Sequence, residues 1–254
     1  MNKPFVRLMI RRSILFPTPE AGVGAVPEGA ARTIINTWTG PDPMARTQSK
    51  DYPEIRDNIL RSAARLFARK GFSTTTIVDL ADACQSSRGA LYHYFSSKEE
   101  ILGSLIGDHV ALMLTELESI GEKRLPPKEH LRMIARKIMH LNAIHKDEQV
   151  LLLNEQNQLD PELQAAIAAT QRKIVALVRD ALTRLDSGHR MISRTASTYA
   201  MSFLGSLNYT YAWYNPEGTV TPQEYADQVV DVFLHGFLTE PAGQDGASTG
   251  TRAG

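Results

Sequence analysis

The chain of 254 residues has few of the side chains that build covalent or metal-based frameworks. It contains one cysteine, Cys84, which excludes an internal disulfide and any C-x-x-C metal or redox motif. No apolar run approaches the roughly 20 residues that a membrane-spanning helix needs. We therefore expect a reduced, cytoplasmic protein with no disulfide framework and no membrane partner.

Signals for catalysis are equally scarce. None of the seven histidines forms an H-x-x-x-H pair, and the sequence contains no glycine-rich phosphate loop. Cys84 falls on an apolar helical stripe, where a thiol is typical of a protein core. The adjacent carboxylates Glu99 and Glu100 point to different sides of a helix, so they do not form an acid–base pair. The sequence predicts a protein that is not an enzyme and that needs no cofactor and no metal.

Net charge is also absent, because 28 Lys and Arg residues balance 28 Asp and Glu residues. The balance is uneven along the chain. Residues 45–98 hold nine Lys/Arg against five Asp/Glu, whereas residues 99–254 hold fourteen against twenty. A local positive excess beside an acidic partner segment is typical of a module that binds phosphates.

The most informative segment that is present runs from residue 71 to residue 102. Thr76 and Asp79 have the spacing of a capping box, so we expect a helix to begin there. Apolar residues follow at helical spacing, and polar residues then interrupt the pattern. Ser86 or Ser87 can cap a second helix that begins directly afterwards. Two short helices joined by a tight turn are typical of a helix-turn-helix.

The polar face of the second helix carries hydroxyls, a cation and an imidazole beside two small residues. Such a surface permits close approach to phosphates and base edges. Lys98 opens a third helix, through a capping box that begins at Ser97, near the expected course of a duplex backbone. The residues predicted to contact DNA are Thr76, Ser86, Ser87, Arg88, Gly89, Ala90, Tyr92, His93, Tyr94 and Lys98. For the polar spacing alone, the alternative is an ordinary helical hairpin with solvated faces.

The order of these motifs resembles the TetR family of bacterial transcriptional regulators, with a likeness that extends from Tyr52 to Leu105. In that family a helix ends in glycine and an aromatic residue, here Gly71 and Phe72. A threonine-rich cap follows, then a recognition helix of the form S-x-G-x-L-Y-x-[HY]-F, here residues 87–95, and the sequence S-K-E at 97–99. The resemblance implies a regulator, expected to be a repressor, that binds double-stranded operator DNA as a homodimer.

Beyond residue 98 the pattern is helical throughout, with proline and glycine at the expected helix ends. We predict an all-α fold of about nine helices. Three of them form a helix-turn-helix DNA-binding domain at residues 45–102, and about six form a ligand-binding and dimerisation domain at 103–240. Residues 1–44 are punctuated by proline and glycine without a sustained period, which predicts a disordered or non-native extension. Residues 241–254 are expected to be a disordered tail.

Two C-terminal helical patterns are apolar on more than one face, whereas a surface helix needs only one such face. The first runs from about residue 189 to residue 214, and the second ends near residue 237. The resemblance implies that both pair with their copies in a partner subunit as a four-helix bundle. The predicted interface residues are Ala200, Phe203, Val229, Val232, Phe233, Gly236 and Phe237. The alternative is that both helices are central in their own subunit.

The family resemblance also implies a small hydrophobic effector that releases the DNA. Residues 208–216 and the capped helix after them resemble members that sense acyl-CoA thioesters of fatty acid or sterol catabolism. Tyr209 and Trp213, expected one helical turn apart, each pair a flat apolar body with a polar tip, so we predict that they line the pocket. Further candidates are Met113, Met133 and Met139 for the wall, and Arg132, Arg136 and Lys137 for the CoA phosphates.

Three alternatives to this effector hypothesis stay open. The aromatic residues can belong to the core or to the dimer interface rather than to a pocket. The effector can be a hydrophobic compound without CoA, as in a multidrug-sensing regulator. The chain can also be a helical ligand-binding or scaffold protein that does not bind DNA.

Overall fold

The computed structural model describes residues 52–186, 188 and 191–238, and within these ranges the only regular secondary structure is helical. The α-helices are α2 (Tyr52–Lys70), α3 (Ile77–Ala83), α4 (Arg88–Tyr94), α5 (Lys98–Gly121), α6 (Pro127–Ile144), α7 (Lys146–Glu155), α8 (Pro161–Thr183), α9 (Ser193–Asn208) and α10 (Pro222–Leu238). Two short 3₁₀ helices, η1 (Gln156–Gln158) and η2 (Tyr209–Ala212), follow α7 and α9. The predicted all-α fold is confirmed, with three helices before residue 98 and six from there on. The predicted extension 1–44 and tail 241–254 lie outside the described residues.

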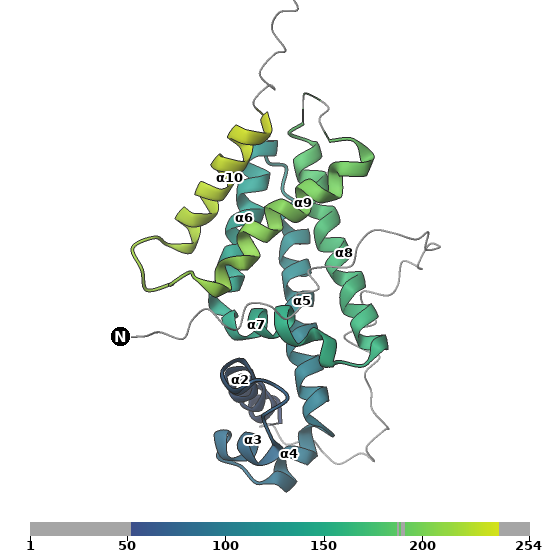
Figure 1. Ribbon diagram of the computed structural model, residues 1–254, viewed down its shortest axis with the longest axis vertical. Helices are drawn as coiled ribbons and strands as arrows, with labels where there is room; N and C mark the ends of the chain where they lie inside the picture. Colours follow the sequence, from purple (N-terminus) through teal and green to yellow (C-terminus); the bar gives the residue numbers. More distant parts are fainter. Residues whose placement is uncertain (1–51, 187, 189–190, 239–254) are drawn as a thin grey trace, which may run out of the picture.

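Helix α5 joins the two ends of the molecule. In Figure 1, α2, α3 and α4 lie at the lower end, α6, α8, α9 and α10 at the upper end, and α5 runs between them. Helix α7 crosses the middle and packs against both α5 and α2. The domain division predicted between residues 102 and 103 therefore falls inside one continuous helix rather than in a linker.

The helix starts follow from side chains that satisfy open backbone N–H groups. Thr76 and Asp79 form the predicted capping box at α3, and Ser87 caps α4 by accepting from the Ala90 N–H. The box predicted at α5 differs by one residue. The Ser97 hydroxyl accepts from the Glu100 N–H, but the Glu100 carboxylate accepts from the N–H and hydroxyl of Ser96 rather than from Ser97. Ser97 thus caps α5 as expected, but the Glu100 carboxylate binds Ser96 of the preceding turn instead of Ser97.

A single apolar cluster spans both ends of the molecule. It includes buried residues of α2, of the helix-turn-helix and of every helix from α5 to α10. Leu102, Ile106 and Leu117 of α5 are at most 1% exposed. Since α5 contributes to the packing at both ends, the position of the helix-turn-helix depends on the packing of the larger helical part.

The helix predicted to run to residue 214 ends earlier, at Asn208. The buried Thr210 hydroxyl donates to the carbonyl of Leu207, and the N–H groups of Trp213 and Tyr214 both donate to the Thr210 carbonyl. The Tyr214 hydroxyl donates to the Val220 carbonyl and so holds the chain in the turn that leads to α10. Hydrogen bonds of this kind stop α9 and replace its expected last turn by η2.

None of the described helices combines the length and apolar character that crossing a bilayer requires.

Candidate functional sites

The helix-turn-helix is fixed by its turn and by its inward-facing residues. Gln85 adopts φ 52°, the one positive φ of a non-glycine residue within the described ranges, and the Ser86 N–H donates to the Ala81 carbonyl. Leu91 and Phe95 of α4 are 2% and 3% exposed. Because these side chains pack inward, the opposite face of α4 is left to solvent.

The exposed face contains most of the residues predicted to contact DNA. These are Ser86, Ser87, Arg88, Gly89, Tyr92 and His93, all of which are exposed. Thr76 is exposed at the start of α3, and Ala90 is half-buried. Tyr92 is 55% exposed although it is a large aromatic residue. The structure thus brings a cation, hydroxyls and an imidazole together on one surface, over a turn that is held by backbone hydrogen bonds.

Two of the predicted residues lie differently. Tyr94 is half-buried and packs on Tyr52 of α2, with ring centroids 4.7 Å apart. The Lys98 ammonium donates to the carbonyls of Phe72 and Thr75, at 3.1 and 3.2 Å, and lies 4.4 Å from the centre of the Phe72 ring. The expectation that Lys98 points to a DNA backbone is therefore corrected. Its charge binds α5 to the loop that precedes α3.

The start of α3 is further stabilised by charge. The Lys70 ammonium lies 2.6 Å from the Asp79 carboxylate. This contact, together with the hydrogen bonds from the Thr76 N–H and hydroxyl, holds the pKa of Asp79 far below its ordinary value. The carboxylate therefore stays ionised through the neutral range, and its contribution to stability is lost only as the pH falls below the ordinary aspartate pKa of 3.8.

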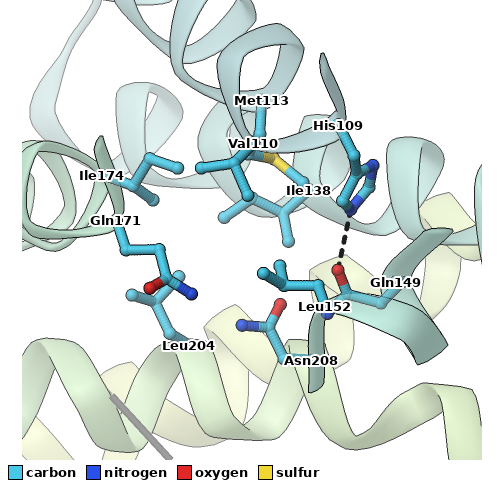
Figure 2. Close-up of a pocket in the computed structure, with 10 residues that line it drawn as sticks. All are labelled: His109, Val110, Met113, Ile138, Gln149, Leu152, Gln171, Ile174, Leu204 and Asn208. Carbon is cyan, nitrogen blue, oxygen red and sulfur yellow. Dashed lines mark hydrogen bonds between the residues drawn. The ribbon is translucent and has the colours of Figure 1, made fainter. Parts of the chain in front are cut away.

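The larger helical part encloses a narrow cavity between α5, α6, α7, α8 and α9 (Figure 2). Its apolar walls come from Val110, Met113, Ile138, Leu152, Ile174 and Leu204, and its polar lining from His109, Gln149, Gln171 and Asn208. The cavity volume is about 30 Å³, which is enough for one or two water molecules at roughly 10–15 Å³ each. A ligand larger than water therefore requires the surrounding helices to move apart.

The polar lining of the cavity is incompletely paired. His109 Nε2 and Gln149 Oε1 are 2.9 Å apart, and since an amide oxygen only accepts, Nε2 carries the proton. Burial lowers the pKa of His109, so its ring is neutral. Gln149 Nε2 and Gln171 Oε1 have no hydrogen-bond partner among the described residues. Both residues are nevertheless buried, at 2% and 6% exposure. Buried polar atoms without partners are rare and costly, and they favour a binding role for this cavity.

The residues predicted to line the effector pocket do not line this cavity. Tyr209 and Trp213 belong to or follow η2 and are 47% and 55% exposed. Met133 is half-buried and packs against the core. Arg136 donates two hydrogen bonds of 2.7 Å to Asp227 of α10. Tyr209 and Trp213 do not continue the inward face of a helix, because α9 ends at Asn208.

The other candidates divide in the same way. Met113 lines the cavity, as predicted, whereas Met139 is buried outside its lining. Arg132 pairs with Asp231, and Lys137 lies 2.7 Å from Glu116. The cations proposed for CoA phosphates are thus engaged in ion pairs. The other lining residues were not predicted from the sequence, and among them three are buried polar residues: His109, Gln149 and Gln171.

The predicted dimer residues also separate into two groups. Ala200 and Phe203 are fully buried within the subunit, where the Phe203 ring packs on Phe233 with centroids 5.2 Å apart. Their assignment to an intersubunit surface is corrected, because α9 packs on α8, α6 and α10 through this face. Val232 is 74% exposed, Gly236 is exposed and Val229 is half-buried. The side chain of Phe237 lies outside the described residues.

Helix α7 connects the cavity with the helix-turn-helix. Gln149 and Leu152 of α7 line the cavity, and α7 also packs against α2. At the end of α7, the Glu155 carboxylate accepts from the Phe72 N–H at 3.5 Å, next to the carbonyls that bind Lys98. One short helix therefore contacts the cavity and the residues that support the helix-turn-helix.

Both parts of the chain match known protein families. Residues 59–105 match the model for bacterial regulatory proteins of the tetR family, and residues 124–237 match a tetracyclin repressor-like C-terminal domain. A TetR-family transcriptional regulator from Bordetella parapertussis is 35% identical, with a TM-score of 0.69 over 74% of this chain and 98% of that chain.

Two further relatives are named regulators. AibR, in a crystal structure with isovaleryl coenzyme A and operator DNA, is 27% identical, with a TM-score of 0.62 over 70% of this chain and 97% of that chain. The transcriptional repressor KstR2 of Rhodococcus jostii is 28% identical over 194 residues, which are 72% of this chain and 91% of KstR2.

The position of Lys98 leads to a prediction about stability. Replacing Lys98 by Met keeps much of the apolar stem over Phe72 but removes the donors to two carbonyls, so the free energy of unfolding is expected to fall by about 1–2 kcal/mol. Urea denaturation followed by circular dichroism measures the change. Lys173→Met, at an exposed position of α8, serves as the control. Equal stability of both variants and the wild type would contradict the assigned role of Lys98.

Proposed function

Because the chain belongs to the TetR family of transcriptional regulators, we propose that it is a repressor that a small hydrophobic effector releases from its operator. The observation that carries this proposal is the combination of an exposed polar face on α4 with an apolar cavity inside the larger helical part. Helix α7 lines the cavity and packs against α2, which in turn packs against α3 of the helix-turn-helix.

In this proposal α4 is the recognition helix. Arg88, Tyr92 and His93 contribute contacts to phosphates and base edges from the exposed face, with Ser86, Ser87 and the small Gly89 allowing close approach. Tyr94 and Lys98 hold this helix against α2 and the loop before α3 rather than contacting the duplex. Thr76 and the half-buried Ala90 remain predicted contacts at the edge of the surface.

The proposed assembly is a homodimer through α9 and α10. On α9, the exposed residues Thr198, Ser202 and Ser206 lie one turn apart, and their short side chains permit close helix approach. On α10, Val232 and Gly236 face outward beside half-buried Val229 and Phe233. A two-fold dimer would present two α4 helices about 34 Å apart, which favours a pseudo-palindromic operator.

For the effector, we propose a molecule with an apolar part that fills the cavity, and an acyl-CoA thioester as the first candidate. The AibR structure contains isovaleryl coenzyme A, and an acyl group suits walls made of Val110, Met113, Ile138 and Leu204. The cavity lining has no lysine or arginine, so the CoA phosphates would lie outside it. A hydrophobic compound without CoA is the second candidate, favoured by the ion pairs that occupy Arg132, Arg136 and Lys137.

Release from DNA would follow from the narrowness of the cavity. A ligand that enters must displace at least one wall, and α7 is a wall that also packs on α2. Movement of α7 would shift the support of α2 and, through the bond between Phe72 and Glu155, the loop that precedes α3. The effector would then favour a dimer whose α4 helices no longer fit two successive major grooves.

The DNA contact predicts a specific effect of Arg88. In Arg88→Ala, affinity for an operator selected from random duplexes is expected to fall, and the slope of log K against log salt is expected to flatten by about one unit, because one phosphate contact is lost. Binding isotherms at several salt concentrations measure both. Arg172→Ala, at an exposed position of α8, is the control, and identical isotherms for the two variants would refute the assignment of α4.

The dimer surface predicts a change of assembly. Val232→Asp places a charge where an apolar contact is proposed, so the dissociation constant of the dimer is expected to rise at least about tenfold. Sedimentation velocity over a range of micromolar concentrations measures this constant. The control is Ile144→Asp, at an exposed apolar position on a different helix, α6. A wild-type protein that is monomeric at these concentrations would overturn the proposed interface.

The effector proposal predicts release by thioesters. Adding acyl-CoAs of increasing chain length to the operator complex is expected to dissociate it. The strongest release is expected at a chain length that the cavity can hold, whereas free CoA is expected to have no effect. Fluorescence anisotropy of a labelled operator measures the release. Release by hydrophobic compounds without CoA, and by no acyl-CoA, would instead support the second candidate.

A further inference from the structure

The cavity lining contains two buried amide atoms that nothing in the described part of the chain satisfies. Gln149 Nε2 is a donor without an acceptor, and Gln171 Oε1 is an acceptor without a donor. The two residues come from α7 and α8 and are 2% and 6% exposed. Figure 2 shows both side chains, with Asn208, around the same space that the apolar residues of α5 and α6 line. The lining therefore holds one unpaired amide donor and one unpaired amide acceptor, beside the ring atom His109 Nδ1, which is also an unpaired acceptor.

The same lining offers nothing to a charged ligand. It contains no lysine, arginine, aspartate or glutamate. His109 is neutral, because burial lowers its pKa and its Nε2 proton is donated to Gln149. A carboxylate in this cavity would lose its hydration without gaining an opposite charge, which is strongly unfavourable.

We infer that the part of the effector that enters this cavity is uncharged and carries both a carbonyl-type acceptor, bound by the Gln149 amide, and an N–H or O–H donor, bound by Gln171. This inference rests on the proposed function, since it names the chemistry of the same effector. Two kinds of molecule share this chemistry: a thioester with the adjoining amide of its pantetheine arm, and a ring compound with a ketone and a hydroxyl. A free carboxylic acid of the same apolar skeleton is rejected.

The cost of the unpaired amides gives the inference a readout that does not depend on any ligand. A buried polar atom without a partner destabilises the folded protein, so replacing Gln171 by Met is expected to leave the melting temperature of the free protein unchanged or to raise it. The same replacement removes the acceptor for the ligand. A residue whose loss improves stability but weakens binding is expected at a functional site. Gln149 is less suitable, because its replacement would also remove the partner of His109.

The test is a binding series on the full chain, measured as the ligand-induced rise in melting temperature. The probes share one acyl skeleton: the CoA thioester, the primary amide, the N,N-dimethylamide, which keeps the acceptor but has no donor, and the free acid. A ring hydroxyketone is the additional probe for the second source. The proteins are wild type, Gln171→Met and the matched control Gln158→Met, at an exposed position of η1.

We expect the wild type to bind the primary amide at least about tenfold more tightly than the dimethylamide and the free acid, as one hydrogen bond to a buried group is worth about a tenfold change. Gln171→Met is expected to lose the preference for the primary amide over the dimethylamide, whereas Gln158→Met keeps it. Comparison of the thioester with the hydroxyketone then distinguishes the two sources.

The inference is overturned if the free acid binds as tightly as the amide, if Gln171→Met keeps the wild-type preference, or if no probe raises the melting temperature of the wild type. Its failure can be distinguished from failure of the proposed function. Probes that bind as expected but do not release the operator would contradict the proposed coupling and leave the chemistry of the cavity intact. Absence of duplex binding by the wild type would contradict the proposed function alone.

Discussion

The packing of α5 is the constraint on which the rest of the structure depends. This helix begins at Lys98, whose ammonium binds the carbonyls of Phe72 and Thr75, and it continues without a break to Gly121. Along the way it buries side chains at both ends of the molecule, including His109 and Met113 of the cavity. A continuous hydrogen-bonded helix transmits displacement rather than absorbing it. One uninterrupted helix therefore joins the helix-turn-helix to the larger helical part.

Helix α7 adds a second, more local connection between the cavity and the helix-turn-helix. It presents Gln149 and Leu152 to the cavity, packs against α2, and ends with Glu155 near the Phe72 N–H. The cavity is small, and two amide atoms of its lining have no partner among the described residues, which is unfavourable for buried polar atoms. A ligand that satisfied these atoms would have to open the cavity, so the free energy of binding would be coupled to a movement of the walls. In the proposed switch, binding is thus coupled to movement because a ligand must displace a wall to reach these amide atoms.

Much of the fold could be predicted from the sequence because helix caps and apolar periodicity are local signals. Thr76 and Asp79 form the predicted capping box, and Ser87 is the one of the two predicted serines that caps α4, since these hydrogen bonds span only three residues. The outward face of α4 followed from the same local pattern. The cavity could not be predicted in this way, because it is formed by five helices that are distant in sequence. Tyr209 and Trp213 were chosen for their chemistry, but the chain leaves its helix at Asn208 through hydrogen bonds to Thr210 and Val220, which no periodicity indicates. Ala200 and Phe203 were assigned to a partner subunit for a related reason, since an apolar face does not reveal which helix covers it.

In the proposed dimer, filling the cavity changes the relative position of the two helix-turn-helix units. The most direct measurement is the distance between spin labels at Arg69→Cys, an exposed position at the end of α2, in a Cys84→Ser background. Double electron–electron resonance would be recorded for the free dimer, for the operator complex and after saturation with an effector that releases the operator. The account predicts that the effector shifts the distance distribution away from that of the operator complex. Release of the operator with an unchanged distribution would contradict it.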